Sequence, residues 1–448
     1  MKHIVISGAG EVGRYAAQVA RKEGLRVTII ETSDEAIARV ENSIDARIVS
    51  GSACHAEVLR QADVSSCDVL MAATSLDEVN LLTASIGKKM GAGIVMARIH
   101  NTSYFDEEFD YRMTFGVDHF VCPEQLTART IASDLTEPNT SQIPRFAQNE
   151  IEIRNFIVSE NSAAANVALK DLKLPPGVRI ALIRRHKESL APVAGTVLSV
   201  SDRVAVIGPG DAFQDVLALF GKGSSGIQNL AVTGAGPVSE WLLQKLDLNR
   251  YRIKLFEKNL DLAERIASKF GQITVIHEDP MEASIFTGEH LEQCDAFLAL
   301  EGNQEHNLLA AMQAKSAGVP NVIALVQSSG LLRILKGTGV DHLYSPRIEA
   351  ARALLQIVDT APVKHLASLD SRVALVYQVK VQPDSPGVAK ALADMDFPDN
   401  AFIAAIEREG SVFCPVFRDQ ISSGDVLIVI GPHDIRKYLL KTFTCQEA

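Results

Sequence analysis

The stretch His3-Ile4-Val5-Ile6-Ser7-Gly8-Ala9-Gly10-Glu11-Val12-Gly13 decides the fold of the N-terminal part of the chain. A short apolar run ends at a glycine turn, and apolar side chains then recur at helical spacing through residue 23. A strand, a glycine turn and a helix in this order begin an α/β domain with a doubly wound parallel sheet.

The same alternation of strand and helix patterns continues to residue 135. We predict strands at residues 3–7, 26–31, 46–49, 69–73, 93–99 and 119–122, and helices at 11–23, 33–42, 77–90 and 123–135. Strands separated by helices in this way pair in parallel, so we expect a Rossmann-like sheet with helices on both faces.

The same plan occurs twice in the chain. Gly8-Ala9-Gly10 returns as Gly234-Ala235-Gly236 (234 − 8 = 226), and Gly116-Val117-Asp118-His119 returns as Gly339-Val340-Asp341-His342 (339 − 116 = 223). Matches in the same order at a nearly constant offset indicate a duplicated unit of roughly 220 residues.

A different pattern separates the two copies. Residues 151–207 carry strand-like runs and a Pro-Pro-Gly turn, which predicts a small α+β lobe ending in a helix near 212–220, and a Gly/Ser-rich linker follows at 221–226. The predicted fold class is therefore α/β, with two doubly wound parallel-sheet (Rossmann-like) domains, each followed by a small α+β lobe, in a tandem duplication. The predicted domains are residues 1–135, 140–222, 228–360 and 365–446.

The composition excludes several functions. There are 44 basic and 55 acidic residues, a net charge of −11, and no basic run, so we expect no nucleic-acid partner. The 6 cysteines are scattered without metal-ligand spacing, which predicts reduced thiols in a cytoplasmic protein and no metal site. Neither a signal peptide nor an apolar stretch of about 18 residues is found, so a role at a membrane requires a partner.

The first glycine turn is a candidate phosphate site. Gly8 permits the tight turn, Gly10 leaves room for a pyrophosphate, and Gly13 lets the helix lie close to the strand. The free N–H groups and the positive dipole end of the helix then face phosphate. The alternative is a glycine turn that only packs well.

Further candidates follow the other strands. Glu31 can accept hydrogen bonds from ribose hydroxyls, which favours NAD over NADP but does not separate NAD from ATP or ADP. Arg98 can bind phosphate. The small residues Gly51, Ser52, Ala53, Ala73 and Thr74 suit an adenine lying against the backbone, with Asp77 and Asn80 beside them. The alternatives are a solvated Glu31, a surface Arg98, and an Asp77 that only favours the helix dipole.

Catalytic groups do not accompany these candidates. The histidines are isolated, no cysteine has a histidine partner, and the sequence has no hydrolase, zinc-protease or Walker A motif. We therefore expect no catalytic residue and no enzyme activity, with the nucleotide acting as an effector. Two alternatives stay open: an NAD-dependent oxidoreductase with an unrecognised substrate lobe, and a nucleotide sensor for a soluble partner.

The second copy has diverged at the equivalent positions. Gly234, Gly236 and Glu257 are kept (257 − 31 = 226), whereas Ser239 replaces the third glycine and no arginine matches Arg98. We expect this site to bind phosphate more weakly, to bind a different nucleotide, or to be structural.

Six stretches carry a family resemblance: ISGAGEVG (6–13), LRQAD (59–63), ATSLDEVN (73–80), ARI (97–99), CPEQL (122–126) and LPPG (174–177). In this order, and with the tandem architecture, the whole chain resembles the TrkA family, the peripheral subunits of bacterial Trk potassium-uptake systems. The resemblance implies two nucleotide-binding RCK/KTN domains, each followed by an RCK-C lobe.

The resemblance also implies a function. Such a chain is a regulatory subunit in the cytoplasm, peripheral at the inner face of the cell membrane, that forms homo-oligomers (a dimer or tetramer) and gates a membrane potassium channel-like subunit of the TrkH/TrkG type. It binds NAD or NADH, and often ATP or ADP. The family roles fall on Gly8, Ala9, Gly10, Glu11, Val12 and Gly13 for pyrophosphate, Glu31 for ribose, Thr74 and Ser75 beyond the fourth strand, and Arg98 for phosphate. Ser52 departs from the acidic residue of many relatives, which affects the contacts to adenosine.

Overall fold

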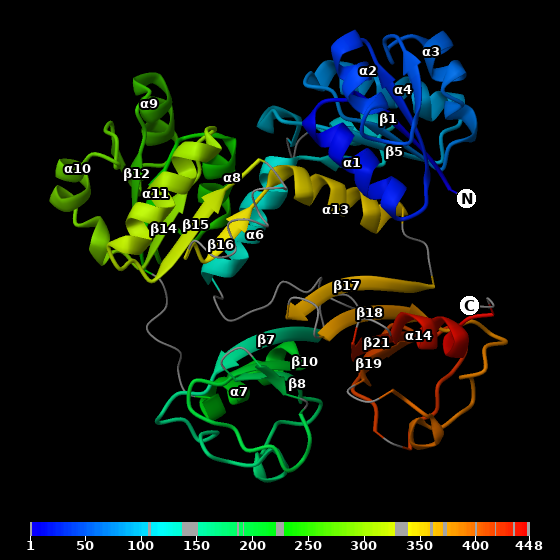
Figure 1. The fold of residues 1–448 in the computed structure, drawn as a ribbon, viewed down its shortest axis with the longest axis vertical. Coiled ribbons are helices and arrows are strands. Elements are labelled where there is room, and N and C mark those ends of the chain that lie inside the picture. Colours follow the sequence, from blue (N-terminus) through cyan, green and yellow to red (C-terminus); the bar gives the residue numbers. More distant parts are fainter. Residues whose placement is uncertain are drawn as a thin grey trace. The chain divides into compact units, whose positions relative to one another are not determined.

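The computed structural model describes residues 2–105, 109–136, 151–185, 188–190, 192–220, 228–327, 339–358, 362–370, 374–398, 401–416, 418–432 and 435–445. The chain forms two compact units, one from Met1–Ala132 with Ile227–Val358 and one from Ser133–Gly226 with Asp359–Ala448. Each unit therefore combines one segment of the first copy with the corresponding segment of the second (Figure 1). The linker predicted at residues 221–226 lies outside the described residues, and the predicted domain limits stay predictions.

The first copy contributes six strands and six helices to the first unit. The strands are β1 (His3–Ser7), β2 (Arg26–Glu31), β3 (Arg47–Ser50), β4 (Val69–Ala72), β5 (Ile94–Arg98) and β6 (His119–Val121). The helices are α1 (Glu11–Lys22), α2 (Asp34–Glu41), α3 (Ala56–Gln61), α4 (Asp77–Met90), α5 (Tyr111–Thr114) and α6 (Pro123–Thr136).

The second copy repeats this order in the same unit. Its strands are β11 (Asn229–Thr233), β12 (Arg252–Phe256), β13 (Thr274–Ile276), β14 (Ala296–Ala299), β15 (Asn321–Leu325) and β16 (His342–Tyr344). Its helices are α8 (Pro237–Lys245), α9 (Leu260–Lys269), α10 (Ala283–Gly288), α11 (Gln304–Ser316) and α13 (Pro346–Val358).

Both sheets of the first unit are parallel and have the Rossmann order. The strands lie in the order β3-β2-β1-β4-β5-β6 and β13-β12-β11-β14-β15-β16. The order reverses between β1 and β4 in one sheet and between β11 and β14 in the other. We call the loops at the carboxyl ends of these strands the first and second switch points, because ligands of such folds bind there.

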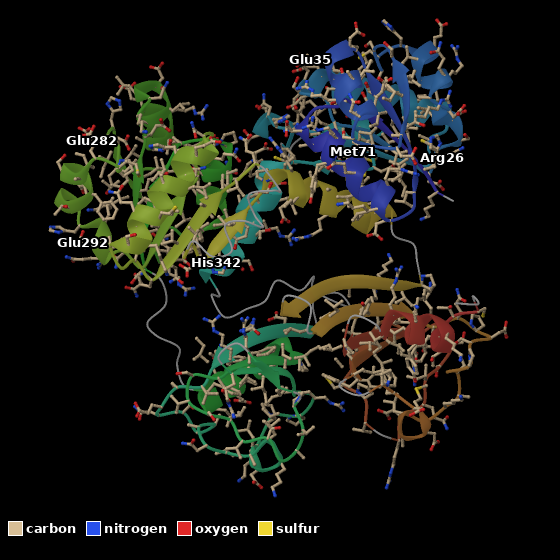
Figure 2. All side chains as sticks on the ribbon, viewed as in Figure 1. Arg26, Glu35, Met71, Glu282, Glu292 and His342 are labelled. Carbon is tan, nitrogen blue, oxygen red and sulfur yellow. The ribbon has the colours of Figure 1, made fainter. Side chains whose placement is uncertain are left out.

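The first sheet is buried on both faces, as its apolar strands require. One core cluster contains Ile6 and Met71, and another contains Val5 and Leu70, their neighbours along β1 and β4. Met71 is fully buried within the domain, whereas Arg26 is exposed at its surface (Figure 2). The predicted fold class is confirmed.

Helix α13 of the second copy packs on the first sheet's helix layer. Ala350, Ala351 and Leu354 are buried in the same cluster as Ala16 and Ala20 of α1. Small side chains on both helices permit this close contact. The first domain is thus covered in part by a segment more than 300 residues away in the sequence.

The second unit consists of two antiparallel lobes. One has β7 (Ile151–Ile157), β8 (Arg179–Arg185), β9 (Glu188–Leu190), β10 (Arg203–Pro209) and α7 (Phe213–Phe220), and the other has β17 (Val363–Asp370), β18 (Ala374–Lys380), β19 (Phe402–Arg408), β20 (Ser411–Phe413), β21 (Val426–Gly431) and α14 (Ile435–Phe443). The sheet orders are β7-β10-β8-β9 and β17-β18-β21-β19-β20. One face of each sheet shares a common core that includes Ala205 and Ile428, and α7 or α14 packs on the other face.

Most predicted elements are confirmed with ends that differ by one or two residues. Helix α3 and strand β9 were not predicted, because elements of six and three residues are too short to show a hydrophobic period. Among the described residues, no helix has the length and apolarity needed to cross a bilayer.

Candidate nucleotide-binding site

The first glycine loop has the geometry that the sequence predicts. Gly8 has a φ of 96°, and a Cβ there would lie 3.0 Å from the backbone of Thr74. A Cβ on Gly13 would lie 2.0 Å from the carbonyl oxygen of Gly8, so only glycine lets α1 approach the loop this closely. Gly10 has open space where its Cβ would be, because no atom of the described residues lies within 4 Å.

No side chain among the described residues caps the N-terminus of α1. Gly10 is the N-cap residue and has no side chain to accept a hydrogen bond from the first-turn N–H groups. The equivalent N-cap of α2, Ser33, does accept such a bond from Ala36 N. Unpaired N–H groups at a helix N-terminus, with open space in front of them, fit the oxygens of a phosphate.

Glu31 is held at the end of β2 beside this loop. One carboxylate oxygen accepts a hydrogen bond from Ala9 N at 2.6 Å, and the other accepts from Thr32 N at 2.7 Å and Ser33 N at 2.9 Å. Burial raises the pKa of Glu31, but these N–H groups outweigh it and hold the pKa below its ordinary value. The side chain is therefore an ionised acceptor fixed where a ribose would lie.

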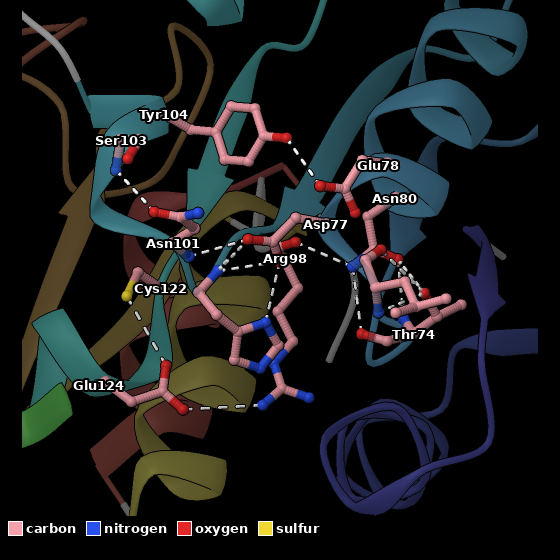
Figure 3. Close-up of polar contacts among 12 residues, drawn as sticks. Thr74, Asp77, Glu78, Asn80, Arg98, Asn101, Ser103, Tyr104, Cys122 and Glu124 are labelled. Carbon is pink, nitrogen blue, oxygen red and sulfur yellow. Dashed lines mark hydrogen bonds and ion pairs between the residues drawn. The ribbon is translucent and has the colours of Figure 1, made fainter. Parts of the chain in front are cut away.

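Asn80 connects the ends of β4 and β5. Its side-chain oxygen accepts hydrogen bonds from Thr74 N (2.8 Å) and Thr74 Oγ1 (2.7 Å), and its side-chain nitrogen donates to Thr74 O (3.1 Å) and Arg98 O (2.9 Å) (Figure 3). Because Asn80 is fully buried and these bonds use all of its amide, it fixes the positions of Thr74 and Arg98.

Asp77 is similarly engaged by the chain that follows β5. Its buried carboxylate accepts hydrogen bonds from the backbone N–H groups of His100 and Asn101 at 2.8–3.0 Å, and lies 2.9 Å from His100 Nδ1. It thereby holds the loop immediately after Arg98 (Figure 3).

Arg98 is a mostly buried cation with unused hydrogen-bonding capacity. Its side chain is 16% exposed, and its Nη2 lies 3.7 Å from a carboxylate oxygen of Glu124, at the start of α6 (Figure 3). Burial lowers the pKa of Arg98, and the charge of Glu124 opposes this. Among the residues that the structure describes, the buried Nε–H has no hydrogen-bond partner, which is costly unless a ligand supplies one. The surface alternative for Arg98 does not match this burial.

The remaining sequence candidates line the same switch point with backbone. Gly51 has a φ of 143° and donates a hydrogen bond to Glu31 O at 2.9 Å, and a Cβ there would lie 2.8 Å from Val58. The hydroxyl of Ser52 accepts from Cys54 N at 3.3 Å, and Ser75 is exposed. The side chains of Ala53 and Ala73 are buried.

The second switch point differs in shape and charge. Gly234 has a φ of 90°, and Glu257 accepts a hydrogen bond from Ala235 N at 2.7 Å, as Glu31 does from Ala9. Ser239 replaces the third glycine, and its buried hydroxyl donates to Gly234 O at 2.6 Å. In the first domain, the backbone of Gly8 leaves no room for a side chain at Gly13. In the second domain, the serine side chain fits at the equivalent position and is hydrogen-bonded to the glycine loop.

Ionic side chains also gather at the second switch point. Lys258 lies 2.9 Å from the carboxylate of Asp279, and His306 lies 2.9 Å from that of Glu301. Glu301 stands where the first domain has Thr74 (301 − 74 = 227). These carboxylates and their partners Lys258 and His306 give the second switch point electrostatic surroundings that differ from those of the first.

The residues of the first switch point fit an adenine dinucleotide or nucleotide. Phosphate would meet the N-terminus of α1, Gly10 and the free Nε–H of Arg98, and ribose hydroxyls would meet Glu31. Sequence reasoning missed Glu124 as the partner of Arg98. The signal was present, because Glu124 follows β6 at the same edge of the sheet at which Arg98 ends β5.

The fold defines a class of proteins with two Rossmann-type domains, each followed by an antiparallel lobe, and the residues of the first switch point fit a nucleotide. Comparison with known proteins gives the same result: the TrkA-N domain matches residues 4–123 and 230–346, and the TrkA-C domain matches residues 153–221 and 376–444. The chain belongs to the TrkA family.

Similar proteins match along nearly the whole chain. A "Trk system potassium uptake protein TrkA homolog" of Archaeoglobus fulgidus is 30% identical over 431 residues, which cover 96% of this chain and 97% of the relative. The "Trk system potassium uptake protein TrkA" of Vibrio alginolyticus is 26% identical over 435 residues, or 95% of each chain. Among solved structures, the GsuK RCK domain has a similar fold, with a TM-score of 0.64 at 15% sequence identity. The match covers 97% of this chain and 93% of the GsuK chain.

Proposed function

We propose that this chain is a regulatory subunit of a potassium-uptake system that binds NAD or NADH, and ATP or ADP, at the first switch point. The observation that carries the proposal is the combination, at one edge of the sheet, of the buried Arg98 at the end of β5, the uncapped N-terminus of α1 and the fixed carboxylate of Glu31 at the end of β2. A role in potassium uptake is supported by the relatives, which are named Trk system potassium uptake proteins. Solved structures of GsuK, which has a similar fold, include one bound to NAD and one bound to ADP.

In this proposal the nucleotide is an effector. Gly8, Ala9, Gly10, Glu11, Val12 and Gly13 hold the phosphates, Glu31 the ribose, and the loops at Gly51–Ala53 and Ala73–Ser75 the adenosine. Asp77 and Asn80 act as positioning residues. A ligand of this kind changes a conformational equilibrium only if it binds one arrangement of the domains more tightly than another, and a coupling of about 1–3 kcal/mol per site is typical.

The effector then acts on a membrane partner. We propose that the chain assembles as a homo-oligomer at the cytoplasmic face of the membrane, beneath a potassium-translocating subunit, and that lobe rearrangement gates the pore. The second switch point keeps Gly234, Gly236 and Glu257, and we propose that it is a weaker or different nucleotide site, because Ser239 replaces the third glycine and no arginine matches Arg98.

The test is potassium flux into proteoliposomes that contain the membrane subunit and the full-length chain. NADH or ATP should change the flux, and the purified chain should not consume either nucleotide at an enzymatic rate. Glu31→Ala and Arg98→Ala should weaken nucleotide binding and remove the response, while the exposed-site variant Arg352→Gln should behave as wild type. Steady NADH oxidation would favour an oxidoreductase instead, and binding without any effect on flux would favour a sensor for a soluble partner.

A further inference from the structure

Arg347 of the second copy reaches the first glycine loop. It is the second residue of α13, and its side chain is 22% exposed and forms an ion pair with Glu11, the first residue of α1. Helix α13 is fixed in this place because Ala350, Ala351 and Leu354 pack in the core formed with α1. A guanidinium from the second domain therefore lies at the helix N-terminus where phosphate is proposed to bind.

Glu11 has more positive charge beside it than its own carboxylate neutralises. Its carboxylate faces two guanidiniums, because Arg14 Nη2 also lies 3.2 Å from it. Burial lowers the pKa of Arg347, Glu11 raises it, and the charges of Arg14 and Arg98 lower it further. Arg98 and Arg347, from different copies, therefore both bring positive charge to the first switch point, and a bound phosphate would be attracted by both.

Arg347 also connects this loop to the second switch point. Its Nη2 donates to Gln327 Oε1 at 3.1 Å, and Gln327 Nε2 donates to Gly302 O at 3.1 Å. Gly302 directly follows Glu301 in the loop after β14. A short series of polar contacts therefore runs from the first glycine loop to the loop at the second switch point.

The equivalent positions of the two copies differ, so the pair formed by Glu11 and Arg347 has no counterpart at the second glycine loop. The first copy has Glu124 where the second has Arg347 (347 − 124 = 223), and Glu124 pairs with Arg98 of its own domain. The position of Glu11 is taken by Pro237 in the second copy (237 − 11 = 226). The sequence thus offers the second glycine loop neither the carboxylate nor the arginine.

We propose that Arg347 completes the phosphate-binding end of the first switch point, so that a nucleotide with a pyrophosphate group is held by both copies of the duplicated domain. The inference rests on the proposed function and names a ligand contact that lies outside the glycine-loop motif. Occupancy of the first site then stabilises the contact between α1 and α13, and it acts on the second switch point through Gln327.

The test is calorimetric titration of the full-length chain with ADP and with NADH. Arg347→Gln should weaken both affinities about tenfold, the effect of one charge-assisted hydrogen bond, and Arg347→Lys should restore part of the loss. Arg352→Gln is the matched control, because Arg352 lies on the same helix, is 57% exposed, and pairs with Glu349. Unchanged affinity in Arg347→Gln with a binding-competent wild type overturns this inference and leaves the proposed function standing. A wild type that binds neither ligand overturns both.

The double variant Glu11→Gln/Arg347→Gln separates contact from charge compensation. If Arg347 touches phosphate, the double variant stays weak, because the guanidinium is still missing. If Arg347 only neutralises Glu11, the double variant recovers the wild-type affinity, and the inference is overturned. Hydrogen exchange of the wild type gives a readout that needs no variant: ADP should slow exchange in residues 346–358, and unchanged exchange there contradicts the proposal.

Discussion

Replacing Gly13 by alanine should lower the stability of the first domain, whereas replacing Gly10 by alanine should lower nucleotide affinity alone. The Cβ of an alanine at position 13 would lie 2.0 Å from Gly8 O, and ordinary contact begins at 3.4 Å. Helix α1 or the glycine loop must therefore move by about 3.4 − 2.0 = 1.4 Å. Overpacking of this kind costs about 1–3 kcal/mol, and here the neighbour is backbone, which yields little.

Gly10 is the matched control because its surroundings are open. In the part of the chain that the structure describes, no atom lies within 4 Å of its Cβ position, and its φ of −66° is one that alanine adopts freely. The loss of N-cap preference and the gain from a less flexible unfolded chain are each below about 1 kcal/mol and opposite in sign. A methyl group in front of the α1 N-terminus would nevertheless occupy the space proposed for pyrophosphate.

The assay combines denaturant unfolding of the full chain with hydrogen exchange of the segment from β1 to α1, and calorimetry with NADH. Gly13→Ala should lower the unfolding midpoint and speed exchange in that segment. Gly10→Ala should leave both unchanged and weaken binding at least about tenfold, as expected for lost phosphate contacts. The reasoning is refuted if Gly13→Ala is as stable as wild type, or if Gly10→Ala binds NADH equally well.

Three further changes test other parts of the structure. Asn80→Ala should destabilise the first domain by about 2 kcal/mol, because the buried groups that it pairs at Thr74 lose their partners; an unchanged melting temperature would contradict its bridging role. Glu31→Gln should make the stability of the folded chain less sensitive to acid. The N–H groups hold the Glu31 pKa below its ordinary value of 4.5. The ionised carboxylate therefore stabilises the fold above that pH, and this stabilisation is lost as the pH falls through the lowered pKa. Melting curves of both proteins from pH 3 to pH 6 check this (roughly the window in which a lowered Glu pKa acts), and identical slopes would speak against it. Asp425→Ala should cost about 2 kcal/mol in the second lobe, since its buried carboxylate accepts two hydrogen bonds from Arg408 at 2.8 Å, and urea unfolding measures the loss.

The fold could be predicted from the sequence because its decisive signals are local. The apolar runs, the glycine turn and their repetition at a constant offset each lie within a few residues of one another, and the parallel sheet follows from their order. The close approach of α1 at Gly13 was predicted for the same reason, since only a glycine fits a helix against its own strand turn.

The features of the site that could not be predicted from the sequence depend on contacts between distant segments. By residue type, Asn80 suits a ligand contact as well as a structural role. Only the folded structure shows that its amide group is fully hydrogen-bonded to Thr74 and Arg98. The pairing of Glu11 with Arg347 joins residues from different copies, through helix packing that no local pattern specifies. Sequence reasoning therefore missed one charge at the site, because Arg347 comes from the second copy.

The central claim is that a nucleotide binds at the first switch point with its phosphates against the N-terminus of α1. The most direct measurement is an electron-density map of the full chain crystallised with NADH. The account predicts density for a pyrophosphate over Gly10, with a ribose on Glu31 and a phosphate oxygen near Arg98. A map of the same crystals with that space filled by protein, or with NADH bound elsewhere, would contradict it.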